Sequence, residues 1–175
     1  VAFAFRKSHV ANQWLMTAQT DGVATAQVDT ATLSGTPEFN DQYTITYHDS
    51  CNVARGSGMG DVFGGQFDIP RNIIKAAANN FVEMAEGTTR EQTFCCGGGG
   101  GLLTDDLLEL RVKGALPRME SLQNVADSHG VNFMASICAI CKAQFTKVLP
   151  YYGFDRRTIG GVHQLVSNAI RLGDK

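Results

Sequence analysis

Five cysteines constrain this chain more than any other feature, because their number is odd and four of them stand in two tight pairs. Cys51 is followed by the adjacent pair Cys95 and Cys96, and then by Cys138 and Cys141 with two residues between them. An odd number of thiols cannot pair completely into disulfides within one chain, and closely spaced pairs are typical of ligands. The pattern therefore favours a metal or redox site over a disulfide framework.

The composition is that of one globular domain or a large part of one. The 175 residues are 43% hydrophobic and 18% charged, with a formal net charge of -2. No apolar stretch approaches the roughly 18 residues that a membrane-spanning helix needs, so we expect no membrane span. The near balance of charge and 9% aromatic content favour neither a nucleic-acid surface nor a disordered tail. Because the chain begins at Val1 without an initiator methionine or a secretory signal, we expect it to be a fragment of something longer.

Two short apolar runs predict buried parallel strands. Residues 43–47 are β-branched and aromatic and end shortly before Cys51, and residues 131–137 end directly at Cys138. The carboxyl ends of parallel strands meet at one edge of a sheet, where ligands and cofactors gather. We therefore expect an α/β fold, with a short parallel sheet flanked by helices and the cysteines of a shared site at the carboxyl ends of its strands.

Helical spacing predicts the elements around this sheet. We expect helices over residues 70–84, beginning at Pro70, from within Cys138–Cys141 toward Pro150, and over 162–172. Residues 102–129 predict two helical segments broken near Gly114–Pro117, with Gly130 as the stop. The expected core positions of these segments are Leu107, Leu108, Leu110, Val112, Met119, Leu122 and Val125.

The N-terminal part is less well defined. Residues 1–18 have a ragged helical pattern, and residues 20–42 carry no clear signal. We therefore divide the chain into a poorly defined part, 1–42, and a cysteine-rich domain, 43–175.

Two glycine-rich stretches predict loops. The stretch 55–65 predicts a flexible loop, and five consecutive glycines, Gly97 to Gly101, follow Cys96 directly. Five glycines are expensive to order, so such a run indicates that the main chain must approach something closely. The run lacks the spacing of phosphate-binding loops, which argues against a nucleotide site. Instead, the N–H groups of residues such as Gly97 and Gly98 are candidates to hydrogen-bond cluster sulfides or an incoming sulfur substrate.

The cysteine spacing also bears on the kind of metal group. Two thiols separated by two residues at a helix start lie near the helix N-terminus, which favours their thiolate form. Adjacent side chains such as Cys95 and Cys96 diverge, so both serve one ion only with strain, whereas a larger cluster accepts them from different directions. This favours an iron-sulfur cluster, with a zinc site or buried thiols as the alternatives.

Three segments of the chain resemble the cysteine-rich CCG domain of the heterodisulfide reductase family. They are residues 47–56 (Tyr-His-Asp-Ser-Cys-Asn-Val-Ala-Arg-Gly), 94–104 (Phe-Cys-Cys followed by five Gly and Leu-Leu-Thr) and 138–145 (Cys-Ala-Ile-Cys-Lys-Ala-Gln-Phe). The resemblance covers about residues 43–173. It is closest to the heterodisulfide-reductase-like subunits of membrane complexes linked to dissimilatory sulfite reduction. The domain is shared with iron-sulfur subunits of glycolate oxidase and anaerobic glycerol-3-phosphate dehydrogenase.

The resemblance implies a cofactor and a reaction. In this family the five cysteines hold a noncubane 4Fe-4S cluster, at which a disulfide is split in one-electron steps. Carried over to this sequence, the metal ligands are Cys51, Cys95, Cys96, Cys138 and Cys141. The chain is then expected to be part of an oxidoreductase acting on sulfur groups. The alternative is an electron-relay or zinc-binding structural CCG domain of another oxidoreductase.

The resemblance also implies partners and a location. Electrons are expected to pass between a quinone-reactive membrane subunit and a disulfide or trisulfide of a DsrC-type sulfur carrier protein, in sulfate reduction or related sulfur metabolism. The subunit is expected to be cytoplasmic and membrane-associated through its partner subunits, without a nucleic-acid partner. Cubane clusters of such subunits belong to an upstream part, and no CxxCxxC run occurs in this chain.

Four charged or titratable residues are candidates for catalysis, and three of them, His48, Arg55 and Lys142, lie close to cysteines in the sequence. His48, three residues before Cys51, could donate a proton to a leaving thiolate, although a structural histidine is the more common case; His163 is a second such candidate. Arg55 and Lys142 could stabilise negative charge on the cluster or orient a carboxylate of the partner.

Overall fold

The computed structural model describes residues 2–7, 14–20, 23–28, 37–57 and 65–170 of the chain. Within these ranges the chain forms two compact units, one built from its first strands and one spanning residues 37–168. The cysteines all lie in the second unit.

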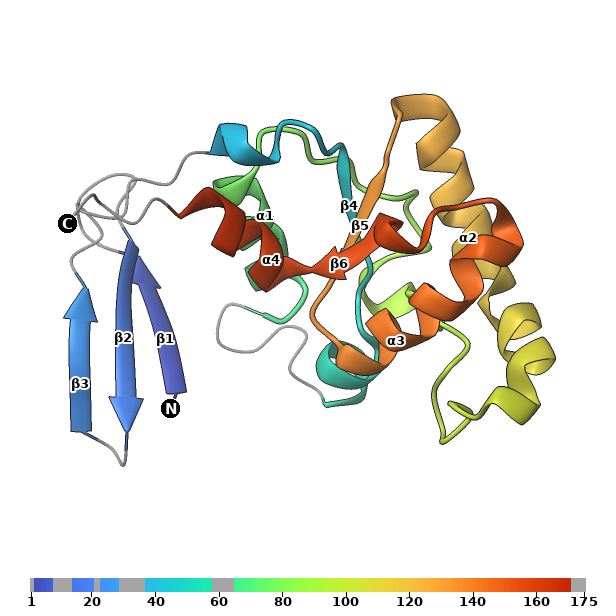
Figure 1. The fold of residues 1–175 in the computed structure, drawn as a ribbon, viewed down its shortest axis with the longest axis horizontal. Coiled ribbons are helices and arrows are strands. Elements are labelled where there is room, and N and C mark those ends of the chain that lie inside the picture. The colour runs from blue at the N-terminus through green and yellow to red at the C-terminus, as the bar shows by residue number, and fades with distance from the viewer. Residues whose placement is uncertain (1, 8–13, 21–22, 29–36, 58–64, 171–175) are drawn as a thin grey trace. The chain divides into compact units, whose positions relative to one another are not determined.

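The first unit is a three-stranded antiparallel sheet. Strands β1 (Ala2–Lys7), β2 (Trp14–Thr20) and β3 (Val23–Val28) pair in chain order, with Phe5 opposite Met16 (Figure 1). The helix expected over residues 1–18 is therefore wrong. Its apolar residues Phe3 and Phe5 are two positions apart, which is the period of a strand.

The second unit is built on a three-stranded parallel sheet. Its strands β4 (Ile45–Tyr47), β5 (Phe133–Ser136) and β6 (Ile159–Gly161) lie in that order, with β5 in the centre. Every residue of the three strands is buried. Both predicted strands are thus confirmed, and so is the α/β fold class.

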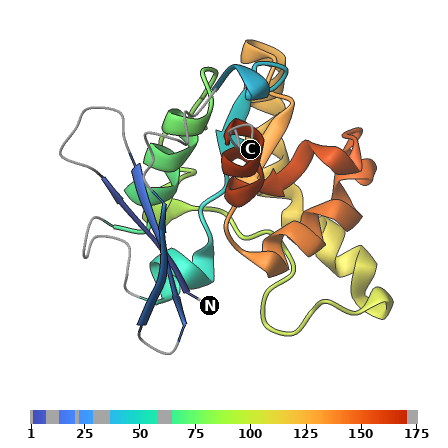
Figure 2. The ribbon, with the colours of Figure 1, turned by 60° about the vertical axis from the view of Figure 1, so that its left-hand side comes forward.

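Helices cover both faces of this sheet. They are α1 (Asp68–Ala77), α2 (Leu108–His129), α3 (Ala139–Val148) and α4 (Val162–Ala169). Figure 1 shows α2 and α3 on one side of the strands and α1 and α4 on the other, and Figure 2 shows the same unit turned by 60°. Leu122 of α2, Met134 of β5 and Phe145 of α3 are fully buried in the core between them. Double coverage explains why every residue of the strands is buried, including the polar Thr46 and Ser136.

Short 3-10 turns connect these elements. They span Pro37–Asn40, Arg90–Gln92, Asp105–Leu107, Leu149–Tyr152 and Arg156–Thr158. Among the described helices, not one combines the length and apolar character that a membrane crossing requires.

Two predicted segments differ from the structure next to the sheet. Helix α1 ends at Ala77 rather than near residue 84, because the chain turns extended at Ala78 and Phe81 pairs with Ile45 at the edge of β4. The start of the predicted loop 55–65 belongs to a π-helical turn, Cys51–Gly56, and residues 58–64 lie outside the described ranges.

Helix α2 is one continuous element, so the break predicted near Gly114–Pro117 is wrong. Pro117 lies inside it, with the buried side chains of Ala115 and Met119 on either side. Packing of this buried face outweighs the intrinsic cost of an internal proline. The predicted stop at Gly130 is confirmed by its left-handed conformation (φ 70°), in which its N–H donates to Ala126 O.

The predicted core of α2 is only partly right. Met119, Leu122 and Val125 are buried, whereas Leu107 and Leu110 are exposed. The two exposed leucines lie at the N-terminal end of the helix, outside its buried middle.

Candidate metal centre

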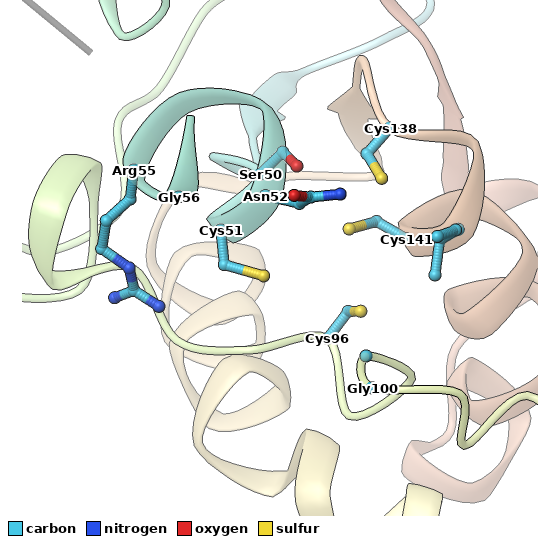
Figure 3. A pocket seen from close by; sticks show the side chains of 11 residues that line it. Ser50, Cys51, Asn52, Arg55, Gly56, Cys96, Gly100, Cys138 and Cys141 are labelled. Atoms are coloured by element: carbon cyan, nitrogen blue, oxygen red, sulfur yellow. The ribbon is translucent and has the colours of Figure 1, made fainter. Parts of the chain in front are cut away.

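Four of the five cysteines line one pocket at the carboxyl edge of the parallel sheet. The pocket has a volume of about 520 Å³, and the sulfur atoms of Cys51, Cys96, Cys138 and Cys141 lie around it (Figure 3). The other lining residues are Ser50, Asn52, Arg55, Gly56, Gly99, Gly100 and Ile140. The fold therefore brings the three cysteine segments together; the strand ends predicted this for Cys51 and for Cys138 and Cys141, whereas Cys95 and Cys96 follow no strand.

Cys51 enters the pocket from the turn that follows β4. The hydroxyl of Ser50 accepts a hydrogen bond from the N–H of Val53 (3.1 Å) and caps the π-helical turn at whose start Cys51 lies. Partial burial and the nearby Cys95 raise the pKa of the Cys51 thiol, while the charge of Arg55 opposes this. A bound cation is therefore needed to favour its thiolate at neutral pH.

Cys138 and Cys141 belong to the N-terminal end of α3. Cys138 is the residue before the helix and Cys141 lies in its first turn, both buried. Burial by itself raises the pKa of Cys138, but hydrogen bonds from the N–H groups of Cys141 and Ile140 and from the Ser50 hydroxyl outweigh it, so the pKa lies below its usual value. The expectation that a helix N-terminus favours thiolate is confirmed at Cys138.

Cys95 and Cys96 diverge, as their adjacency predicted. Cys95 is exposed, whereas Cys96 is 1% exposed. A hydrogen bond with Cys96 raises the pKa of Cys95, and a hydrogen bond with Cys141 raises the pKa of Cys96 to about 12. One thiol thus faces outward and its neighbour faces the pocket.

The glycine run supplies main-chain donors to this pair. The N–H of Gly97 donates to Cys95 Sγ at 3.3 Å, Gly99 also donates to Cys95, and Gly98 donates to Cys96. Gly97 and Gly98 are buried beneath the two thiols, while Gly99 lines the pocket. These N–H groups stabilise negative charge on sulfur.

Gly97 also explains why glycine is needed here. Its φ is +83°, and a Cβ at this position would lie 2.5 Å from Arg111 O and 2.8 Å from Ala115 N. The close main-chain approach predicted from the glycine run is confirmed, and the partner is the backbone of α2.

The five thiols form one series in which each affects the pKa of a neighbour: Cys95 acts on Cys51, Cys96 acts on Cys95, and Cys141 acts on both Cys96 and Cys138. Within the described part of the chain, no three His, Cys, Asp or Glu side chains are grouped closely enough to hold a single ion. Five thiols in series, four of them lining a pocket and the fifth, Cys95, next to Cys96 in sequence, fit a group of several metal ions.

The structure does not place His48 on the pocket wall. The side chain is 1% exposed, its ring packs edge-on against Phe145 (centroids 4.8 Å apart), and neither ring nitrogen has a hydrogen-bond partner among the described residues. Burial, together with the charge of Arg118, holds its pKa well below the usual value. His163 is exposed on α4 and is likewise not a lining residue.

Of the two cationic candidates, only Arg55 lines the pocket. Its Nη1 donates to Glu91 O (2.9 Å) and Thr93 O (3.3 Å), which ties the Cys51 turn to the segment that leads to Cys95. Lys142 is half-buried on α3 and is not among the lining residues.

Sequence reasoning missed the charged groups buried behind the pocket. Asp49 is fully buried and pairs with Arg71 of α1, which also contacts Glu83. A second buried arginine, Arg118, lies in the middle of α2. The available signal was an acidic residue directly after a buried strand, since such a carboxylate needs a partner.

An α/β unit with free thiols gathered at the carboxyl edge of a parallel sheet defines a cysteine-rich domain with a metal-binding donor set. The chain belongs to the CCG cysteine-rich domain family, whose sequence model matches residues 45–146. The expected resemblance to this domain is therefore confirmed.

Two curated archaeal proteins are similar to the chain. It is 45% identical over 136 residues to the Hdr-like menaquinol oxidoreductase iron-sulfur subunit of Archaeoglobus profundus, covering 78% of this chain and 23% of that protein. It is 42% identical over 131 residues to the Hdr-like menaquinol oxidoreductase iron-sulfur subunit 2 of Archaeoglobus fulgidus, covering 75% and 22%. The chain thus spans less than a quarter of these relatives. No solved structure matches it.

Proposed function

We propose that this domain is the cluster-binding part of an iron-sulfur oxidoreductase subunit of the heterodisulfide-reductase-like type. In this proposal Cys51, Cys95, Cys96, Cys138 and Cys141 hold a noncubane 4Fe-4S cluster. The observation that carries it is the series of five thiols, four of which line one pocket. Membership of the CCG family and the names of the two archaeal relatives support it.

The reaction that we propose is the reversible reduction of a disulfide or trisulfide. Splitting one disulfide takes up two electrons and two protons and yields two thiols. The cluster supplies one-electron chemistry and iron sites for sulfur when it is bound. The chain's own residues provide the thiolate ligands, the N–H donors of Gly97 and Gly98, and an open pocket for the substrate.

We assign the charged candidates different parts in this reaction. Arg55 provides a positive charge on the pocket wall that offsets negative charge on sulfur. Lys142, outside the wall, is proposed as a docking charge for a partner carboxylate. We do not assign proton donation to His48, because a buried imidazole with a lowered pKa is neutral at pH 7 and has no proton to spare.

We further propose that the subunit is of the DsrK type. Its partners are then a quinone-reactive membrane subunit and a DsrC-type sulfur carrier protein in dissimilatory sulfur metabolism, and it is held at the cytoplasmic side of the membrane through those partner subunits. The word menaquinol in the names of both relatives supports the quinone link. The three cysteine segments support the DsrK type.

Metal analysis of the full-length protein, purified without oxygen, tests the cofactor. Cys138→Ser should lose about four iron and four acid-labile sulfide per chain relative to the wild type. Ser128→Ala, an exposed position near the C-terminal end of α2, is the control and should keep the wild-type content. About one zinc lost from Cys138→Ser with no change in sulfide would contradict the cluster proposal and favour a structural zinc site.

Electron paramagnetic resonance tests the reaction. Oxidation in the presence of the reduced sulfur carrier protein should produce a paramagnetic signal that is absent from Cys138→Ser. A signal that does not change when the thiol is added would instead indicate an electron-relay domain.

A further inference from the structure

Helix α2 buries a cation that makes no direct contact with an acidic side chain among the described residues. Arg118 is 1% exposed, and its terminal nitrogens donate only to neutral acceptors: Met84 Sδ, Thr88 O and, at 2.9 Å, Thr93 Oγ1. Its Nε has no hydrogen-bond partner among the described residues. Burial lowers the pKa of Arg118 to about 10, so the side chain is still charged at pH 7.

The other buried arginines of the domain are compensated differently. Arg71 is 3% exposed and makes ion pairs with both Asp49 and Glu83. Arg111, seven residues before Arg118 on the same helix, is 2% exposed; it donates to Gln144 Oε1 at 2.7 Å and lies 3.8 Å from a carboxylate oxygen of Asp105. In the described part of the chain, Arg118 makes no ion pair within 4 Å. A buried charge without a directly bonded anion is unfavourable, so further negative charge close to Arg118 would stabilise it in the functional protein.

Arg118 contacts the residues that directly precede Cys95 in the chain. Its Nη2 holds the hydroxyl of Thr93, and its guanidinium lies over the ring of Phe94, 5.7 Å from the ring centroid. Cys95 is the next residue along the chain. A Cys141 thiolate is also close enough to interact favourably with the guanidinium charge. The carboxylates of Asp49 and Glu83 act on the charge of Arg118 more strongly than Cys141 does, but both contact Arg71 directly and neither contacts Arg118.

We propose that Arg118 is the buried counter-charge of the thiolate centre, a positioning residue that raises the reduction potential of the metal group held by the five cysteines. The inference rests on the proposed function, because it assigns this charge to an anionic cluster. Several thiolates and their metal ions carry net negative charge, and each added electron makes it larger. A fixed positive charge in a low-dielectric interior stabilises the reduced form and therefore raises the potential.

The test uses Arg118→Met and Arg118→Lys in the full-length protein, purified without oxygen. Methionine keeps much of the length without the charge, and lysine keeps the charge without the planar guanidinium. Arg111→Gln is the matched control, since it removes a buried arginine charge from the same helix. The potential is measured by titration with redox mediators, following the signal that disappears in Cys138→Ser.

Removing the charge should lower the potential. Arg118→Met should shift the one-electron equilibrium about tenfold toward the oxidised form, which corresponds to about 59 mV. In Arg118→Lys and in Arg111→Gln, the reduction potential should change by no more than about a third of that shift. Equal shifts in Arg118→Met and Arg118→Lys, or no shift in Arg118→Met, would overturn the proposal.

The outcomes also separate this inference from the proposed function. If Arg118→Met does not retain iron, retention by Arg118→Lys supports a charge requirement, and loss in both variants overturns it in favour of a packing role. A wild-type protein with zinc and no labile sulfide at these cysteines defeats the proposed function, and with it the redox role of Arg118. A cluster with normal iron and sulfide content, whose reduction potential does not change when Arg118 is replaced, would contradict only the proposed role of Arg118 and would leave the proposed function standing.

Discussion

Asp49 and Arg71 form a bidentate ion pair next to the cysteine pocket. Both carboxylate oxygens of Asp49 accept a hydrogen bond from the terminal nitrogens of Arg71, each at 2.7 Å, and both side chains are buried. Asp49 also accepts the main-chain N–H of Arg90 (2.8 Å), and its carbonyl accepts the hydroxyl of Thr93 (3.1 Å). This one residue therefore fixes the Cys51 turn to α1 and to the segment that precedes Cys95.

Replacing Asp49 with Asn should destabilise the domain by about 3 to 5 kcal/mol, because removal of one partner leaves a buried charge incompletely compensated. Urea unfolding of the anaerobically purified protein measures this. The control is Glu109→Gln, which breaks the exposed pair with Lys113 and should cost less than about 0.5 kcal/mol. Similar costs for the two variants would show that the buried pair contributes no more than a surface pair.

Gly97→Ala should destabilise the domain more than Gly101→Ala. Both glycines have φ near +84°, which costs an alanine roughly 1 kcal/mol. Only at Gly97 would the new Cβ also collide with the backbone of α2, whereas nothing lies within 4 Å at Gly101. We expect Gly97→Ala to lose bound iron as well, because the shift moves the donors of Cys95 and Cys96. Equal unfolding free energies for the two variants would contradict the predicted contact.

The stability of the domain should fall in mild acid because of His48. Its pKa is lowered in the folded state, so below about pH 6.5 the unfolded chain binds a proton that the folded chain does not. The free energy of unfolding then decreases as pH falls, by at most about 1.4 kcal/mol per pH unit from this residue. Above that pH the contribution is fully present.

The comparison of wild type with His48→Leu isolates this effect. Denaturation between pH 5 and pH 8, as an experimental range, should give a smaller acid-side slope for the variant. His129→Gln, at the exposed end of α2, should keep the wild-type slope. An unchanged slope in His48→Leu would mean that another group causes the acid sensitivity.

Binding of a sulfur carrier protein should depend on Arg55 and, less strongly, on Lys142. Arg55→Gln removes the cation on the pocket wall and should weaken binding roughly fivefold at low salt, corresponding to about 1 kcal/mol. Lys142→Ala should weaken it by a smaller factor, and added salt should reduce both effects. Calorimetric titration at two salt concentrations measures them, with the exposed Lys113→Gln as the control. Affinities that match the wild type at low salt would remove both residues from the docking site.

Two of the three strands of the parallel sheet and the cysteines beside them could be predicted because they depend on local signals, whereas β6 was not predicted. The apolar runs before Cys51 and Cys138 are buried strands, and parallel strands bring their carboxyl ends together whatever the helices do. The helix beginning after Cys138 follows from the same logic. These local patterns were enough to predict that Cys51 and the pair Cys138 and Cys141 share one site.

The remaining features depend on tertiary contacts that leave no local pattern. Helix α2 continues through Pro117 because the residues on both sides of it, Ala115 and Met119, are buried in the hydrophobic core. The compensated Arg71 and the uncompensated Arg118 look alike in sequence, and only the fold shows which one meets carboxylates. His48 adjoins the cysteine turn in sequence, yet its ring packs against Phe145 in the interior.

The series of thiols also limits when the metal-binding site can form during synthesis of the chain. Its members come from the turn after β4, from the glycine segment before α2 and from the start of α3, so the series is incomplete until the ribosome has released residues 51 to 141. A nascent chain that ends before Cys138 presents at most three of the five sulfurs. The complete set of proposed ligands therefore exists only after Cys141 has been synthesised and the three segments have folded together.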